Sequence, residues 1–119
     1  MNAFDIMDQV HQSGGTTVCL NGSYVPFTGY LVAFGGQFGK ALPKKQATAL
    51  ALANFIKKHY GQLVRGSGVY LGVWKDGETG KVWFDLVECV RSEKEAVELG
   101  KQRKQIAVWN IAQAKEVRC

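Results

Sequence analysis

Two neighbouring segments with alternating apolar side chains constrain the fold more than any other feature of the sequence. Residues 69–75 and 81–91 are rich in β-branched and aromatic residues, and a five-residue segment with two glycines, Asp76–Gly80, separates them. This pattern predicts an antiparallel hairpin of two strands. Side chains alternate between the two faces of a strand. One face of the hairpin should therefore pack under helices, and it carries Val69, Leu71, Val73, Val82, Phe84 and Leu86.

Six further segments have helical or strand periodicity. We expect helices over residues 3–12, 43–60 and 93–104, and strands over residues 16–20, 24–34 and 106–110. Ser92 and Glu95 form a capping box at the start of the third helix. The dipeptide Asn21-Gly22 predicts a tight turn that pairs the first two of these strands as a hairpin. The polar tail, residues 113–119, is expected to be loose.

This order of elements predicts one α+β domain over residues 1–119, because the chain contains no internal repeat and no linker. From residue 24 onward the order is strand–helix–strand–strand–helix–strand, which is typical of the ferredoxin-like βαββαβ arrangement. A short helix and a hairpin strand would precede it. The alternative is a plain antiparallel meander. Both arrangements place the two main helices on one face of an antiparallel sheet.

Basic residues dominate the first part of the chain. Fifteen Lys and Arg against ten Asp and Glu give a net charge of +5. Residues 9–75 contain no acidic residue, and the basic residues among them are Lys40, Lys44, Lys45, Lys57, Lys58, Arg65 and Lys75. Such a stretch is suited to a negatively charged partner, which is either a phosphate backbone or an acidic protein surface.

The predicted helix over residues 43–60 concentrates this charge on one face. Its core stripe is Thr48, Leu52, Phe55, Ile56 and His59, and the opposite face carries lysines and an exposed leucine. The candidate partner-binding residues in this region are Lys40, Lys44, Lys45, Leu50, Lys57 and Lys58. The alternative is a lysine-rich face that only keeps the protein in solution.

Large aromatic residues on the second face of the predicted hairpin form the other candidate surface. Tyr70, Trp74 and Trp83 share this face. They could contact a partner protein, since Trp and Tyr often dominate the binding energy of interfaces, or they could stack on nucleobases. Residues 81–89 lack the RNP1 signature of RNA-recognition modules. The alternative is that the N-terminal helix and hairpin cover this face as a second core layer.

The sequence lacks the patterns of common catalytic, cofactor and metal sites. The Gly39-Lys40 pair does not end a phosphate-binding P-loop, because Phe34 and Ala41 replace the required Gly and Ser or Thr. The two histidines have no metal-ligand spacing. Asp85 and Glu88 alternate to opposite faces of one strand and so cannot act as a catalytic pair. We expect no enzymatic activity, no catalytic residue, no cofactor and no metal.

The cysteines and the apolar runs indicate the compartment. The three cysteines are far apart and include no CxxC pair, which is typical of a reducing environment rather than of a disulfide framework. No apolar run reaches the roughly 20 residues that a membrane span needs. Residues 1–12 do not have the pattern of a secretory signal. We therefore expect a cytoplasmic protein with no membrane contact.

The second half of the chain contains several short motifs: Leu71-Gly72-Val73-Trp74, Thr79-Gly80-Lys81-Val82, Leu99-Gly100-Lys101 and the segment Gln105–Asn110. Together they resemble a loosely defined set of small proteins from phages, plasmids and other mobile elements of bacteria. The resemblance is confined mainly to residues 68–112. It implies a small accessory protein of a mobile element, and such proteins commonly work by binding a host or defence protein. It implies no agreed activity.

These observations together predict a non-catalytic binding protein of phage or mobile-element origin in the cytoplasm of a bacterial host. It would act by occupying a host target, such as a nucleic-acid-handling or defence complex, in the manner of an anti-CRISPR-like inhibitor. The alternative is a small basic module that binds nucleic acid directly. The partner and the oligomeric state stay open.

Overall fold

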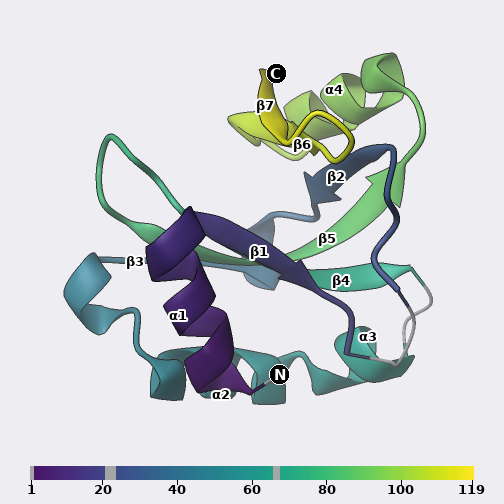
Figure 1. The fold of residues 1–119 in the computed structure, drawn as a ribbon. Coiled ribbons are helices and arrows are strands. Elements are labelled where there is room, and N and C mark those ends of the chain that lie inside the picture. The colour runs from purple at the N-terminus through teal and green to yellow at the C-terminus, as the bar shows by residue number, and fades with distance from the viewer. Residues whose placement is uncertain (1, 21–23, 66–67) are drawn as a thin grey trace.

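A curled antiparallel sheet with strand β5 at its centre organises the fold (Figure 1). The structure, a computed structural model, describes residues 2–20, 24–65 and 68–119. The strands are β1 (Gly15–Val18), β2 (Tyr30–Ala33), β3 (Gly39–Leu42), β4 (Val69–Lys75), β5 (Val82–Val90), β6 (Ala107–Asn110) and β7 (Lys115–Arg118). The helices are α1 (Ala3–Ser13), α2 (Ala49–Lys58), α3 (Tyr60–Arg65) and α4 (Glu93–Gln102), with the short 3₁₀ turns η1 (Gly36–Phe38) and η2 (Lys44–Gln46).

The predicted hairpin of two long strands is confirmed as β4 and β5. Lys75 pairs with Val82 beside the turn, and the antiparallel register continues to Val69 and Glu88 at the other end. The other edge of β4 pairs with β1, while the other edge of β5 pairs with β3 and then with β2. The order of the sheet is β1-β4-β5-β2-β6-β7, with β3 also beside β5.

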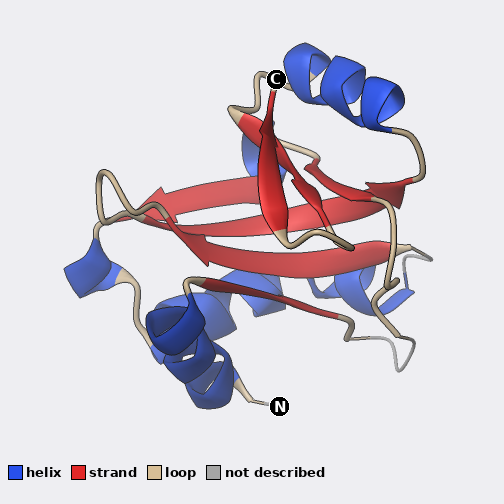
Figure 2. Cartoon of the chain, turned by 45° about the horizontal axis from the view of Figure 1, so that its top comes forward, coloured by secondary structure: helices blue, strands red, loops and turns tan. Residues whose placement is uncertain are grey.

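The α+β class is confirmed, and the helices cover one face of this sheet. Side-chain alternation places Val82, Phe84, Leu86 and Val90 on the same face of β5. The first three pack in one core cluster with residues of α1, α2 and α3, and Val90 packs in a second cluster with Ala96 of α4. Figures 1 and 2 show α1 and α2 on the opposite side of the central strands from the β6–β7 hairpin. We call the face on which α1 and α2 pack the helix-covered face, and we call the opposite face of the sheet the open face.

The four strands of the predicted βαββαβ core are neighbours in the order β4-β5-β2-β6. This is not the order of a plain meander, in which consecutive strands pair. The sheet also contains β1, β3 and β7, which lie outside the four-strand plan. The prediction that the tail over residues 113–119 is loose is wrong in part. Strand β7 pairs with β6, and its Val117 packs with Val108 in the second core cluster.

The predicted hairpin between residues 16–20 and 24–34 is wrong. β1 pairs with β4, and β2 pairs with β5 and β6, so that β4 and β5 lie between the two strands. The predicted turn Asn21-Gly22 lies outside the described residues. β2 begins only at Tyr30, after Gly29 with its φ of +100°. Pro26 upstream has no N–H to donate to a neighbouring strand, which also explains why this segment forms no strand.

The predicted long helix starts later and continues further than expected. α2 begins at Ala49 because the Thr48 hydroxyl caps it, accepting a hydrogen bond from the Ala51 N–H at 3.1 Å. Thr48 is exposed and does not belong to the core stripe in which we predicted it. After His59 the chain continues as α3. Within the predicted helix, Lys44–Gln46 form η2 instead of the first turn, and β3, a strand that we did not predict, precedes them.

Candidate functional site

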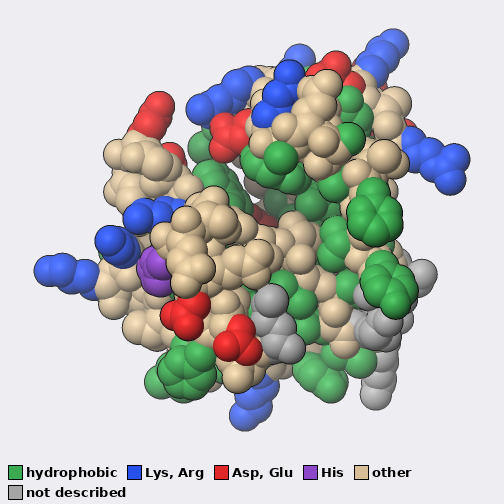
Figure 3. Space-filling view, in the orientation of Figure 1, with side chains coloured by type: hydrophobic (Ala, Val, Ile, Leu, Met, Phe, Trp, Pro, Cys, Tyr) green, Lys and Arg blue, Asp and Glu red, His purple; other side chains and the backbone are tan. Residues whose placement is uncertain are grey.

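A groove with a volume of about 550 Å³ on the open face of the sheet is the first candidate site. The outer strands β1 and β6 line the same groove as the central β4 and β5, so the open face is concave. Figure 3 shows the surface hollowed below the β6–β7 and α4 region, with hydrophobic side chains around the hollow. All three tryptophans of the chain line the groove, together with the apolar Leu31, Ala33, Val87 and Ile106. We call it the tryptophan groove.

Three strands position these tryptophans. Trp74 and Trp83 are directly opposite in the register of β4 and β5, and their rings stack with centroids 5.8 Å apart at an interplanar angle of 8°. Trp109 of β6 pairs with Leu31 of β2, which places both on the same face of the sheet. Trp74 and Trp83 are half-buried and Trp109 is 40% exposed. The groove therefore presents aromatic surface that the protein core does not use.

Asp85 of β5 is the acidic residue at the floor of the tryptophan groove, and only 5% of it is exposed. The Trp74 indole N–H donates a hydrogen bond to its Oδ2 atom at 3.2 Å. Glycines lie opposite Asp85 on both neighbouring strands, Gly72 on β4 and Gly39 on β3. A Cβ atom on Gly39 would lie 2.7 Å from Oδ1 of Asp85. The absence of a side chain at Gly39 therefore makes room for the carboxylate.

Burial changes the acid strength of this group. Removal from water disfavours the charged form and raises the pKa of Asp85 to about 6, although the hydrogen bond from Trp74 favours the charged form. At neutral pH the floor of the groove therefore holds a negative charge in a mostly apolar environment.

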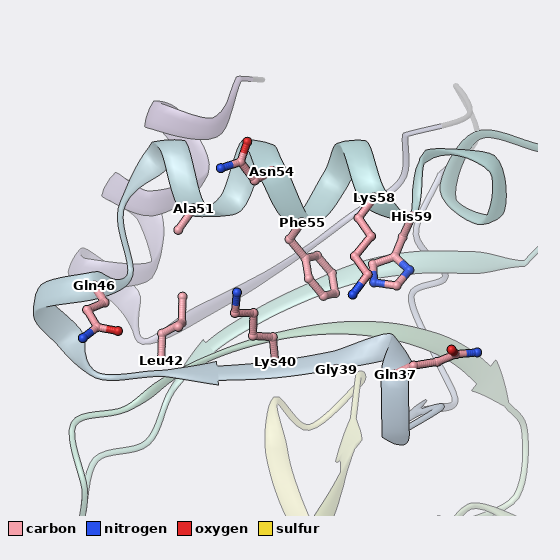
Figure 4. Close-up of a pocket in the computed structure, with 10 residues that line it drawn as sticks. All are labelled: Gln37, Gly39, Lys40, Leu42, Gln46, Ala51, Asn54, Phe55, Lys58 and His59. Carbon is pink, nitrogen blue, oxygen red and sulfur yellow. The ribbon is translucent and has the colours of Figure 1, made fainter.

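A cleft of about 510 Å³ between β3 and α2, on the helix-covered face, is the second candidate site. In Figure 4 the side chains of Lys40 from β3 and Lys58 from α2 both extend into this cleft. The remaining polar lining comes from amide side chains and from His59, and no acidic residue is among the described residues that line it. The two ion pairs in the described part of the chain, Arg103–Glu88 and Arg118–Glu116, include neither lysine. We call it the basic cleft.

His59 at the end of the basic cleft belongs to the core. It is 5% exposed, and its ring lies 4.7 Å from that of Phe55 and 5.7 Å from that of Phe38, measured between centroids. Burial, and to a lesser extent the charge of Lys58, lowers the pKa of His59. The prediction that His59 lies on the apolar side of its helix is confirmed.

The structure separates the predicted partner-binding residues into different regions. Lys40 and Lys58 line the basic cleft, whereas Lys44 and Lys45 are exposed on η2. The predicted single basic helix face is therefore wrong, because Lys44 lies on η2, whereas Lys57 and Lys58 lie on α2. Lys57 and Leu50 are exposed on α2, and 71% of Leu50 is accessible to solvent.

Tyr70 is not available as a surface residue. It is 8% exposed and packs with Leu31 and Val87, under Cys19 and Val25 of the segment before β2. Its burial raises the pKa of the Tyr70 hydroxyl. The open face is thus covered at the Tyr70 end and hollow at the Trp83 end. The N-terminal helix does not cover it, since α1 packs in the core cluster on the other face.

The predicted binding residues did not include Asp85 or Trp109, although both line the tryptophan groove. Strand alternation already places Asp85 on the same face as Trp83, so its position was predictable, but an acidic residue in an apolar face carries no local sign of burial. Trp109 lies 26 positions after Trp83 in the sequence numbering. Its place in the groove depends on the pairing of β6 with β2 and could not be read from local periodicity.

Among residues 2–20, 24–65 and 68–119, no group of three or more His, Cys, Asp or Glu side chains is placed to hold a metal ion. No helix in this part of the chain is long and apolar enough to cross a membrane. Comparison with protein-family models, with curated proteins and with solved structures found no match to this chain.

Proposed function

We propose that the protein is a non-catalytic binding protein that takes an apolar or aromatic segment of a partner protein into the tryptophan groove. The observation that carries this proposal is the groove itself, which three tryptophans and a nearly buried carboxylate line at the uncovered end of the open face. The origin in a phage or mobile element, and the inhibition of a host or defence complex, stay predictions.

The chemistry of the groove supports binding of this kind. Ligand sites in proteins are typically concave, about 300–1,000 Å³ in volume and mostly apolar, with a few polar groups that set orientation. The tryptophan groove has this volume and this composition. Trp is also the residue most enriched among those that dominate interface energies. Burial of Trp83 and Trp109 under a partner would remove large apolar surfaces from water.

The arrangement of charged groups favours binding over acid–base catalysis. Such catalysis uses two titratable groups that converge on one substrate. Asp85 is nearly buried at the floor, whereas the other acidic residue that lines the groove, Glu116, is exposed on β7.

Selection of short random peptides displayed on a carrier tests the proposal. We expect the wild-type protein to enrich peptides that share an apolar or aromatic residue, and Trp83→Leu and Trp109→Leu to lose binding to them. Tyr60→Leu is the matched control, because Tyr60 is an exposed aromatic residue of α3 outside the groove. Absence of enrichment, or equal binding by the groove variants and the wild type, would contradict the proposal.

The basic cleft favours a second candidate function, binding of a nucleic-acid backbone. Lys40 and Lys58 extend into one cleft without a neutralising acid among its described lining residues, and phosphate contacts by lysines dominate such affinity. Fluorescence anisotropy with random single- and double-stranded oligonucleotides at about 50 mM salt should then show binding that weakens steeply with salt. Lys58→Gln should weaken it, and Lys94→Gln on α4 should not. Absence of binding at this salt concentration rejects this candidate.

A further inference from the structure

We propose that the tryptophan groove recognises an arginine side chain of the partner protein, whose guanidinium group pairs with the carboxylate of Asp85. This inference rests on the proposed function and names the group that the groove selects. The proposed ligand is arginine. The test below distinguishes it from lysine and from a purely apolar side chain.

The surroundings of Asp85 leave its charge uncompensated. The Trp74 N–H is its hydrogen-bond donor in the structure, at 3.2 Å, and neither ion pair in the described part of the chain involves this carboxylate. A carboxylate has acceptor sites for about four hydrogen bonds. A nearly buried charge without a cationic partner is costly, and a ligand that supplies the cation and further N–H donors removes that cost.

The walls of the groove suit the shape of arginine. Its guanidinium group is planar, so it can stack on an indole ring while its N–H groups bind a carboxylate in a two-point contact. Its three methylene groups can pack against the apolar lining, which includes Leu31 and Val87. The compact and strongly hydrated ammonium group of lysine offers neither the planar stacking nor the two-point contact.

The local charge of the groove also favours a cation. Two acidic residues, Asp85 and Glu116, and two lysines, Lys75 and Lys104, line it. Lys75 pairs with Val82 at the end of β4, and Glu116 already forms an ion pair with Arg118. Lys104 and Glu116 are exposed, so water and salt screen their charges more than that of Asp85 at the floor. The nearly buried charge of the groove, that of Asp85, is therefore negative in a protein whose net charge is +5.

Matched peptides test this inference in the full-length protein. The probes are Ac-Gly-Trp-Arg-Gly-NH2 and the same peptide with citrulline, the neutral isostere of arginine, or with lysine. Peptide binding is followed by the indole N–H signals of isotope-labelled protein in NMR spectra, because the Trp74 N–H is bonded to Asp85 itself. We expect the arginine peptide to bind at least about tenfold more tightly than the citrulline peptide, as a charge-assisted contact would provide.

Two variants locate the source of this preference. Asp85→Asn should bind the arginine and citrulline peptides equally, whereas Glu116→Gln should keep most of the preference. The preference of the wild type should also decrease on acidification through about pH 6, where Asp85 becomes protonated. This change should be absent in Asp85→Asn if Asp85 causes it, rather than Glu116, Lys75 or Lys104, the other charged residues that line the groove.

The outcomes distinguish this inference from the proposed function. Equal binding of the arginine and citrulline peptides to the wild type overturns the inference, while the proposed function stands. A preference for the lysine peptide, or a preference that depends on Glu116 rather than on Asp85, also overturns it. If no peptide shifts the indole signals and the peptide selection also fails, both the inference and the proposed function are wrong.

Discussion

At the scale of single residues, Asp85 shows how a sheet can hold a carboxylate in an apolar groove. Gly39 and Gly72 lie opposite it on the two neighbouring strands, and Trp74 supplies one hydrogen bond. The protein retains a group that is costly to bury. Groups of this kind, with a perturbed pKa and in a concavity, are often found at functional sites.

The pKa of Asp85 predicts a specific dependence of stability on pH. Its folded-state pKa of about 6 lies above the ordinary value of 3.8, so the folded state holds this proton more tightly than the unfolded state does. The contribution of Asp85 to stability is therefore highest below about pH 4 and is lost as the pH rises to about 6. Relative to the wild type, Asp85→Asn should gain up to about 3 kcal/mol in free energy of unfolding between about pH 4 and pH 7.5.

Urea denaturation of both proteins at the two pH values measures this difference. Any constant effect of the amide group cancels in the comparison. Glu116→Gln serves as the control at an exposed carboxylate, and its difference from the wild type should change little with pH. A difference between Asp85→Asn and the wild type that does not change with pH would contradict the assignment.

At the scale of secondary-structure elements, α2 shows why helix boundaries are hard to predict from periodicity. Thr48 falls on the apolar stripe when the helical pattern is extended toward Pro43. In the structure it is the N-cap, and the segment before it forms η2. The sequence pattern could not distinguish a position on the helix face from an N-cap position, because Thr is compatible with a helix face and is also favoured as a cap.

Substitutions at Thr48 test its capping role. Thr48→Ala removes the hydroxyl that accepts from the Ala51 N–H and should cost about 1 kcal/mol of stability, whereas Thr48→Ser should cost little. Thr48→Val keeps the shape but not the hydrogen bond, so it should behave like Thr48→Ala. Urea denaturation provides the measurement. If Thr48→Val is as stable as the wild type, packing rather than capping is the role of Thr48.

At the scale of the whole molecule, the sheet separates the two candidate surfaces. The basic cleft lies on the helix-covered face between β3 and α2, and the tryptophan groove lies on the open face. Asp85 and Lys40 sit on adjacent strands, but alternation turns them to opposite faces, because Lys40 pairs with Phe84. The basic cleft and the tryptophan groove therefore lie on opposite faces of the sheet.

The concentration of positive charge predicts a salt-dependent effect on stability. Lys40 and Lys58 share one cleft, so their repulsion should destabilise the folded state at low ionic strength. Lys58→Gln should therefore raise the urea midpoint at about 20 mM NaCl, and this gain should vanish at about 0.5 M NaCl, where charges are screened. Lys101→Gln, in the last turn of α4 as Lys58 is in the last turn of α2, should show no such gain. A gain for Lys58→Gln that persists at high salt would exclude repulsion as its cause.

Local periodicity was sufficient for the α+β class, for the β4–β5 hairpin and for the face shared by Trp74 and Trp83, because alternation along a strand is a property of the chain itself. The partner of each remaining strand depends on contacts between distant segments, and there the predictions of the first hairpin and of the tail were wrong. Only the tertiary structure decided that the sheet curls, that Trp109 lines the same groove as Trp74 and Trp83, and that Asp85 is nearly buried there. The burial of Asp85 and the curl of the sheet arise from packing between strands that are distant in the sequence, and no short stretch of sequence contains that information.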